Sequence, residues 1–203
     1  MKVEVYGESR KGADHAENED AILINKRKNL FAVGDGVTLP FGGKEASTRA
    51  IKYLDKLFTG NLEDAFEKVN QKVLDDKSKN PAIGHTTLLA VHVTLDKTVE
   101  IASVGDSRAY LINDGIKLLL APSLTYVIGE PKIIVDIWRY SPRTDEYIFL
   151  CTDGVTNVVK EEEIQQFVGK TTIRKAVTQI LNLAESRPTA YNDDKTAILV
   201  KLY

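Results

Sequence analysis

Three apolar runs of this 203-residue chain each end on an aspartate that stands beside glycine or serine. The runs are "NLFAVGDGV" (29–37), "VEIASVGDSR" (99–108) and "YIFLCTDGV" (147–155), and their acids are Asp35, Asp106 and Asp153. Other acids precede apolar runs: Glu19 and Asp20 before 21–26, and Asp193 and Asp194 before 196–203. A single Asp-Gly pair is ordinary turn chemistry. The repeated arrangement indicates instead that strand ends bring carboxylates together.

Crowded carboxylates of this kind predict a metal site. A hairpin places the start of one strand beside the end of the next, so we expect Glu19 and Asp20 at one sheet edge with Asp35. Carboxylates within about 4–6 Å raise one another's pKa, which makes such an edge unfavourable without a cation. Oxygen ligands without cysteine indicate Mg²⁺ or Mn²⁺ rather than zinc. Two ions sharing a carboxylate would activate a water and hold a phosphoryl oxygen during in-line attack.

The elements that must position these acids follow from hydrophobic periodicity. Apolar residues at three- and four-residue spacing predict helices at 44–58, 62–77, 160–168 and 172–186. Strands are predicted at 2–7, 21–26, 30–35, 86–94, 99–105, 108–113, 116–120, 132–140, 147–152 and 196–203. Short links between strands and helices arriving in pairs argue against a doubly wound parallel sheet. We expect one α+β domain over 1–203, a four-layer α/β/β/α sandwich of two mainly antiparallel sheets flanked by helix pairs.

Composition excludes several classes of function. The net charge is −2 and the pI about 6.0, so no basic field is present to attract nucleic acid or a membrane surface. The single cysteine, Cys151, rules out a disulfide within the chain and favours the cytoplasm. The N-terminal residues alternate in polarity and show no signal-peptide pattern, and no run approaches the length of a membrane span. The oligomeric state stays open, with a monomer as the expectation.

The motifs fall in the order found in a known family. They are "NED" (18–20), "VGDG" (33–36), "GHTT" (84–87), "VGDSRAYL" (104–111), "CTDG" (151–154) and "NDDKTAILV" (192–200). Together they resemble the metal-dependent Ser/Thr protein phosphatases of type 2C, also called PPM, over almost the whole chain. The resemblance implies a β-sandwich flanked by helix pairs and a centre of two Mg²⁺ or Mn²⁺ ions, with a weak third site. It also implies hydrolysis of phosphoserine or phosphothreonine in phosphoprotein substrates.

The resemblance assigns roles to individual residues. The catalytic water would be bound to metal held by Asp35 and Asp153. Asp35 corresponds to the acid that bridges both ions, and the Gly36 carbonyl to the backbone ligand beside it. Asp153 and Asp193 correspond to the acids that hold one ion. Glu19 corresponds to the acid that binds the other ion, with Asp20 behind it, and Asp106 to the acid linked to the third, weaker metal site. Asp193 is preferred to Asp194 because it lies three residues before Thr196, as in the family motif Asp-Asn-x-Thr.

Four departures from the family pattern change the expectations. His15 stands where an Arg usually binds the substrate phosphate, so phosphate binding is assigned to His15 or to nearby Arg10, with a solvated loop histidine as the alternative. Four residues are inserted before the glycine pair in "DGVTLPFGG", which predicts a remodelled loop. Asn157 replaces an acid and weakens the third site. The segment 121–138 has room for only a reduced flap, as in a compact, prokaryotic-like form.

Three functions therefore remain open from sequence. The first is a metal-dependent Ser/Thr protein phosphatase, which the retained acids favour. The second is a catalytically weak or inactive interaction module with the phosphatase fold, which His15 and Asn157 would fit. The third is hydrolysis of another phosphate ester, such as a small metabolite or phosphotyrosine.

Overall fold

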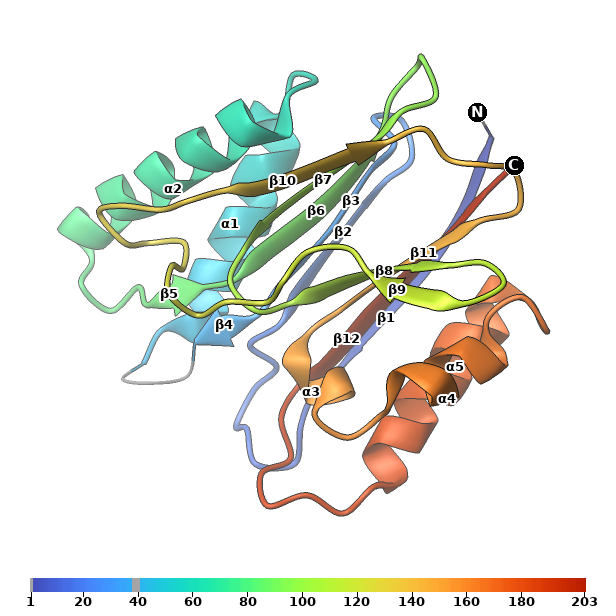
Figure 1. The fold of residues 1–203 in the computed structure, drawn as a ribbon. Helices are drawn as coiled ribbons and strands as arrows, with labels where there is room; N and C mark the ends of the chain where they lie inside the picture. The colour runs from blue at the N-terminus through green and yellow to red at the C-terminus, as the bar shows by residue number, and fades with distance from the viewer. Residues whose placement is uncertain (1, 38–40) are drawn as a thin grey trace.

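Two antiparallel five-stranded sheets form the centre of the molecule in a computed structural model that describes residues 2–37 and 41–203 (Figure 1). The first sheet has the order β1-β12-β11-β8-β9, formed by Val3–Arg10, Lys195–Leu202, Tyr147–Cys151, Arg108–Ile112 and Ile116–Leu118. The second has the order β10-β7-β6-β3-β2, formed by Asp136–Tyr140, Val99–Val104, Leu88–Val93, Leu30–Gly34 and Ala21–Asn25. A small ladder pairs β4 (Gly36–Val37) with β5 (His85–Thr86).

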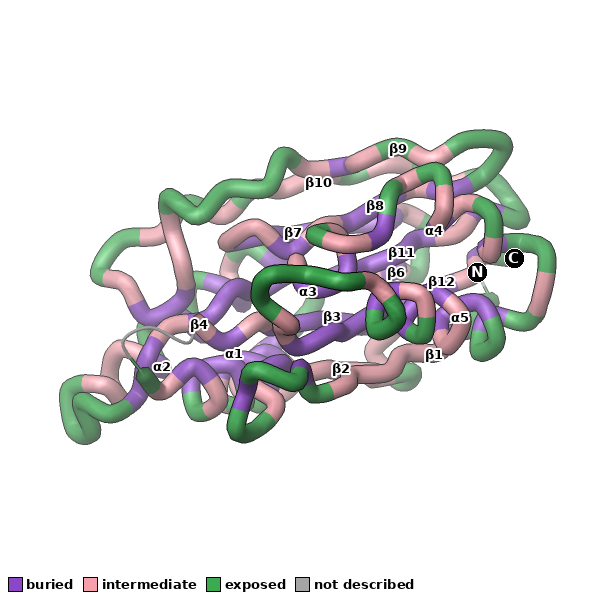
Figure 2. The backbone as a smooth tube through the Cα atoms, turned by 90° about the horizontal axis from the view of Figure 1, so that it is seen from below, coloured by how far each residue is buried: buried purple, intermediate pink, exposed green. Residues whose placement is uncertain are grey.

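Helix pairs cover the outer faces of both sheets. Helices α1 (Gly43–Leu57) and α2 (Leu62–Lys79) pack on the second sheet, and α4 (Glu161–Phe167) and α5 (Ile173–Ser186) on the first (Figure 1). A third apolar cluster, which includes Phe31, Val91 and Ile148, fills the space between the sheets. The buried residues follow the strands and the inner faces of the helices (Figure 2). The predicted four-layer α/β/β/α sandwich is confirmed.

Local sequence explains where the helices begin and which face they bury. The side chain of Asn61 accepts the N–H of Asp64 at the start of α2, and Thr172 accepts that of Lys175 at the start of α5. The buried residues of α5 recur at three- and four-residue spacing: Ile173, Ala176, Val177, Ile180, Leu181 and Ala184. Among the described residues, no helix combines the length and apolar character needed to cross a bilayer.

Several segments differ from the sequence prediction. β1 runs to Arg10, beyond the strand predicted at 2–7, and the strand predicted at 86–94 is divided into β5 and β6. The strand predicted at 132–140 begins only at Asp136, and Asp153–Thr156 forms a short helix, α3, that was not predicted. Between β9 and β10 the chain forms no helix, in agreement with the predicted reduction of the flap. This segment is anchored by Asn70, whose side chain donates to Glu130 O (2.9 Å) and accepts the N–H of Gly129 (2.8 Å). Residues 38–40, within the loop predicted to be remodelled, lie outside the described residues.

Candidate metal centre

The ends of four elements bring acidic residues to one open pocket. Asp35 lies between β3 and β4, Asp106 in the turn between β7 and β8, Asp153 at the first residue of α3, and Asp193 just before β12. The complete lining comprises Asp35, Gly36, Val37, Thr87, Asp106, Leu124, Asp153 and Asp193. Distant parts of the chain therefore place four carboxylates around one space, as the strand-end pattern predicted.

Backbone packing fixes the position of Asp35. Its N–H donates to the Thr87 hydroxyl (3.0 Å), and its carbonyl accepts the N–H of Thr87 (2.8 Å) and the hydroxyl of Thr86 (2.8 Å). The next residue, Gly36, packs so tightly on α1 that an added Cβ would lie 2.4 Å from the carbonyl carbon of Gly43. Only glycine fits there. The turn that carries Asp35 is thus held rigidly against the end of β5, the residue that follows it and α1.

The four carboxylates repel one another. Burial raises the pKa of Asp35 well above its ordinary value, and the charges of Asp20, Asp153, Asp193 and Asp106 raise it further. The pKa values of Asp106 and Asp193 are also raised, first by burial and then by the charge of Asp153. Such mutual repulsion is what a cation among these side chains would relieve.

Glu19 and Asp20 lie beside this pocket and carry buried oxygens without a partner among the described residues. These atoms are Glu19 Oε2 and Asp20 Oδ1. The other oxygen of Asp20 accepts the hydroxyl of Thr152 (2.9 Å). Burial raises the pKa of Asp20 to about 7, a rise to which the charges of Asp194 and Asp193 add. A buried acceptor without a donor is costly, so these two atoms are suited to contact an electropositive ligand such as a cation.

Asp193 and Asp194 face different surroundings. Asp193 lines the acidic pocket, whereas Asp194 is 2% exposed and turns its carboxylate toward the loop 11–20. Asp194 Oδ1 accepts the N–H of Gly12 (2.7 Å), and Oδ2 accepts that of Glu19 (2.6 Å). This placement agrees with the choice of Asp193 as the candidate ligand, whose role stays a prediction.

His15 is buried, so its interpretation as a solvated loop histidine is wrong. Its side chain is 4% exposed, and Nδ1 lies 2.6 Å from Asp194 Oδ2. Nε2 contacts the hydroxyl of Tyr191 and lies 3.3 Å from Asp193 Oδ1. Burial lowers the pKa of His15, but the hydrogen bond and charge of Asp194, with the charges of Asp193 and Glu19, give a net increase. Both ring nitrogens are therefore already engaged with protein groups.

Arg10 is also occupied away from the pocket, which speaks against its assigned role in phosphate binding. Its guanidinium donates to Glu8 (2.7 Å) and, across the sheet face, to Asn182 and Glu185 of α5 (2.8 Å each). These partners exist because β1 packs beside α5, a contact that the local sequence does not reveal. The described lining of the acidic pocket includes no Lys, Arg or His.

Sequence reasoning missed several groups at this site. Thr87 and Leu124 line the pocket, and Thr152 holds Asp20, yet none of these was assigned a role. The "GHTT" motif could have pointed to Thr87. Leu124 carries no chemical signal, and its place follows only from the path of the chain between β9 and β10. Tyr191 is joined to His15 by a long-range contact that no local pattern predicts.

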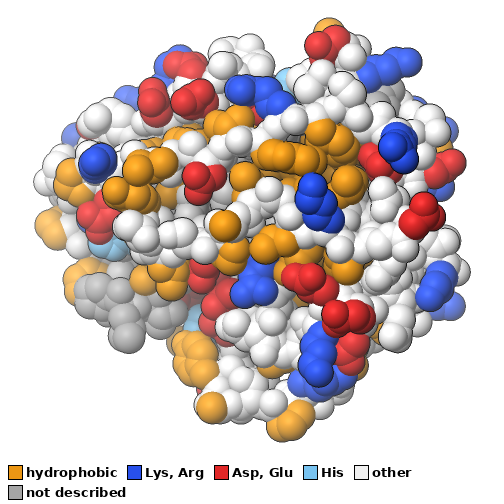
Figure 3. All heavy atoms as spheres, viewed as in Figure 1, with side chains coloured by type: hydrophobic (Ala, Val, Ile, Leu, Met, Phe, Trp, Pro, Cys, Tyr) orange, Lys and Arg blue, Asp and Glu red, His pale blue; other side chains and the backbone are white. Residues whose placement is uncertain are grey.

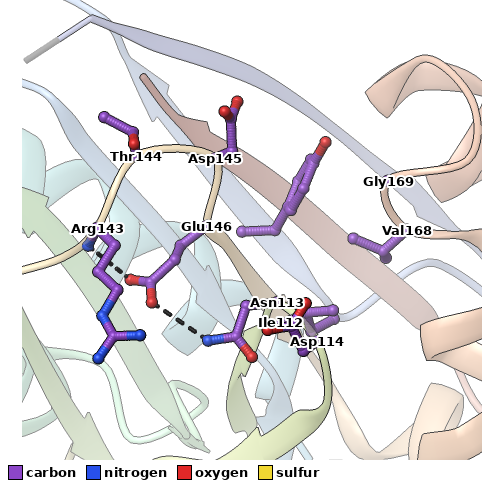
Figure 4. Close-up of a pocket in the computed structure, with 10 residues that line it drawn as sticks. Ile112, Asn113, Asp114, Arg143, Thr144, Asp145, Glu146, Val168 and Gly169 are labelled. Carbon is purple, nitrogen blue, oxygen red and sulfur yellow. Dashed lines mark hydrogen bonds between the residues drawn. The ribbon is translucent and has the colours of Figure 1, made fainter.

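A different pocket lies at the other end of β11, lined by Asn113, Arg143 and Glu146 among others (Figure 4). Glu146 accepts the side-chain amide of Asn113 (3.2 Å) and the backbone N–H of Arg143 (3.0 Å). Both oxygens of Glu146 therefore accept hydrogen bonds from neighbouring protein groups, whereas Glu19 and Asp20 each have a buried oxygen without a donor. The candidate chemistry therefore belongs to the acidic pocket and not to this one.

Comparison with known proteins identifies the family. The serine/threonine phosphatase stp of Listeria innocua is 26% identical over an alignment of 229 positions, which spans 92% of this chain and 90% of that protein. The crystal structure of serine/threonine phosphatase Stp1 from Staphylococcus aureus superimposes with a TM-score of 0.89 at 24% identity, covering 100% of this chain and 96% of that one. The catalytic domain of serine threonine protein phosphatase PstP in complex with two manganese ions has a TM-score of 0.89 at 19% identity and covers 98% of each chain. The family described as Stage II sporulation protein E (SpoIIE) matches residues 41–203, and the chain therefore belongs to this family of PPM-type domains.

Proposed function

We propose that this protein is a metal-dependent phosphatase that hydrolyses phosphoserine and phosphothreonine in proteins. The observation that carries the proposal is the acidic pocket, where four carboxylates from distant elements meet beside the unpartnered buried oxygens of Glu19 and Asp20. The listerial and staphylococcal relatives, whose names describe serine/threonine phosphatases, support the substrate class.

The residues present fit a pair of hard divalent cations. All side-chain donors are carboxylate oxygens, the ligands preferred by Mg²⁺ and Mn²⁺. In this proposal Asp35 would be shared by both ions, and the Gly36 carbonyl would be the backbone ligand beside it. Asp153 and Asp193 would hold one ion, and Glu19 the other. Asp20 supports Glu19 from behind, and Asp106 stands at a weaker third site. When bound, such ions supply an activated water and neutralise the charge that develops on the phosphoryl group.

The protein's own contribution is to orient these oxygens and to leave the pocket open. Thr87 fixes the Asp35 backbone, and Thr152 holds one oxygen of Asp20. The side chain of Asn157 donates to Asp153 Oδ2 (3.1 Å), which fixes the rotation of that carboxylate. Because the described lining carries only negative formal charge, binding of a phosphate anion requires the cations.

The surroundings suit a protein substrate. Leu124, 64% exposed, stands on the rim, and the reduced segment 121–135 leaves the pocket uncovered by a helix. On the face shown in Figure 3, basic and acidic side chains are interspersed rather than gathered into a field of one sign. We keep a cytoplasmic location and a monomeric state as parts of this proposal, the former supported by the single, buried free thiol of Cys151.

The test is hydrolysis of a phosphoserine peptide by the purified protein with Mn²⁺, compared with Asp35→Asn and Asp153→Asn. Both substitutions should reduce kcat/KM by at least about 100-fold, because each removes a charged ligand. Asp145→Asn is the matched control, because the side chain of Asp145 is 75% exposed and lies at the other end of β11, outside the lining of the acidic pocket. Hydrolysis that survives removal of metal by EDTA would refute the proposed chemistry. Absence of Mn²⁺ binding by calorimetry would favour the interaction module.

A further inference from the structure

Two loops that carry candidate metal ligands meet at Asp194. The loop 11–20 follows β1 and carries Glu19, and the loop 187–194 precedes β12 and carries Asp193. They lie side by side at the lower edge of Figure 1, one blue and the other red. Asp35 and Asp153 are placed by a strand end and a helix start. Glu19 and Asp193 depend instead on how these two loops are held together.

Asp194 joins the loops through three short contacts from one carboxylate. The N–H of Gly12 donates to Oδ1 (2.7 Å), the N–H of Glu19 donates to Oδ2 (2.6 Å), and His15 Nδ1 lies 2.6 Å from Oδ2. Because one of these donors is the backbone of Glu19 itself, the position of Glu19 is tied to the residue that follows Asp193. A buried carboxylate that receives several N–H groups is strongly oriented.

The backbones of the two loops are packed against each other at the same place. A Cβ on Gly12 would lie 2.2 Å from the carbonyl oxygen of Asn192 and 2.3 Å from the carbonyl carbon of Asp193. In addition, the N–H of Asn192 donates to Asp14 (2.6 Å), and Asn192 in turn accepts the N–H of Ala13 (3.1 Å). The contact therefore requires glycine at position 12 and fixes the register of the loops.

His15 completes this arrangement from inside the loop 11–20. Its carbonyl accepts the ammonium of Lys11 (2.6 Å), and its ring spans Asp194 and the Tyr191 hydroxyl. Position 15 has His where the family pattern has Arg, and position 194 has Asp where the pattern has Asn. The side chains at these two positions contact each other directly in the structure.

We propose that Asp194 and His15 act as a positioning pair, which sets Glu19 and Asp193 at the distance that the metal centre needs. This inference rests on the proposed metal-dependent function. His15 acts through Asp194 and not by binding the substrate phosphate. His15, Asp193 and Asp194 offer ligand atoms within 4.8 Å of one another, but both oxygens of Asp194 already receive N–H donors. A cation bound there would have to displace the contacts that hold the loops.

Two substitutions of His15 separate the positioning role from other roles. In His15→Asn the side-chain amide can replace Nδ1 and keep the contact with Asp194. In His15→Gln it replaces Nε2 and keeps only the contact with Tyr191. We expect His15→Gln to weaken Mn²⁺ binding by about 10- to 100-fold in calorimetry, and His15→Asn to weaken it by less than about 10-fold. In the metal-free protein, the amides of Gly12 and Glu19 should exchange hydrogen faster in His15→Gln than in His15→Asn.

The control is His92→Gln, which changes a half-buried histidine on β6 that makes an edge contact with Phe58 and lies outside both loops. Equal Mn²⁺ affinity and equal amide exchange in both His15 variants would overturn the proposal. An equal rise in KM for the phosphopeptide in both variants, with unchanged Mn²⁺ affinity, would do so as well, because it would mean that His15 contacts substrate. If His15→Gln does not fold, Asp194→Asn replaces it and should show the same loss of Mn²⁺ affinity; parental affinity in Asp194→Asn would overturn the proposal.

The outcome can be separated from failure of the proposed function. A parental protein that binds no Mn²⁺ would refute the metal centre. The amide-exchange comparison needs no metal and would still decide whether Asp194 and His15 hold the two loops together.

Discussion

The acidic pocket makes the stability of the metal-free protein depend on pH, and Asp20 offers the sharpest test. The pKa of Asp20 rises from 3.8 to about 7, mainly through burial. Between these two values the folded state holds a proton on Asp20 that the unfolded state has lost. Stability therefore falls as pH rises through this window, and the loss is complete above about pH 7.

The magnitude follows from the width of the window. The window ends at the folded-state pKa of about 7, so a change from pH 5 to pH 8 crosses about two pH units of it. Each of these units corresponds to about 1.36 kcal/mol in the free energy of unfolding. Ionisation of Asp20 should thus lower the free energy of unfolding by roughly 2.7 kcal/mol between pH 5 and pH 8. Other groups also titrate, so the informative quantity is the difference between the parental protein and Asp20→Asn, which keeps the acceptor for Thr152 but cannot ionise.

Urea unfolding in EDTA at pH 5 and pH 8 measures this difference. Asp20→Asn should lose about 2–3 kcal/mol less than the parental protein over that range. Saturating Mn²⁺ at pH 8 should restore stability to the parental protein, by about 2.7 kcal/mol at one hundred times the dissociation constant. If the free energy of unfolding depends on pH identically in the two proteins, burial and the acidic neighbours do not raise the pKa of Asp20.

Two further predictions address the placement of Arg10 and the packing of Gly36. Arg10→Ala should leave the KM for a phosphopeptide unchanged within about twofold. It should lower the free energy of unfolding by no more than about 1 kcal/mol, because the acids that Arg10 contacts are partly exposed. A rise in KM of about tenfold would instead support a role of Arg10 in phosphate binding. Gly36→Ala should destabilise the protein by more than about 2 kcal/mol in thermal unfolding, because the added Cβ would lie 2.4 Å from the carbonyl carbon of Gly43. A melting temperature equal to that of the parental protein would contradict this packing.

Much of the fold could be predicted because its signals are local. Apolar periodicity gave the helices α1, α2 and α5 nearly to their ends, since each buries one stripe of residues. Helix α3 was missed because "TDG" has the composition of a turn, whereas here Thr152 begins a helical turn that packs beside β12. β10 is shorter than predicted because the apolar residues 133–135 and the preceding Lys132 do not pair with β7.

The site was predictable where an acid ends a strand and unpredictable where two loops meet. Asp35, Asp106 and Asp153 could be brought together by strand geometry alone. The contact between His15 and Asp194 joins residues 179 positions apart and depends on the tertiary packing of β1 against β12. The partners of Arg10 on α5 could not be predicted for the same reason, because they are equally remote in sequence.

The antiparallel pairing of β1 with β12, from Val3 with Leu202 to Arg10 with Lys195, has a consequence for biosynthesis. β1 leaves the ribosome long before β12 is synthesised. The N–H of Glu19 likewise has no contact with the Asp194 carboxylate, 175 positions downstream, until that residue has been made. If Glu19 and Asp193 bind metal as proposed, the nascent chain cannot complete the site before β12 has been synthesised. We therefore expect the proposed phosphatase activity to be absent from a chain whose synthesis has not yet passed β12.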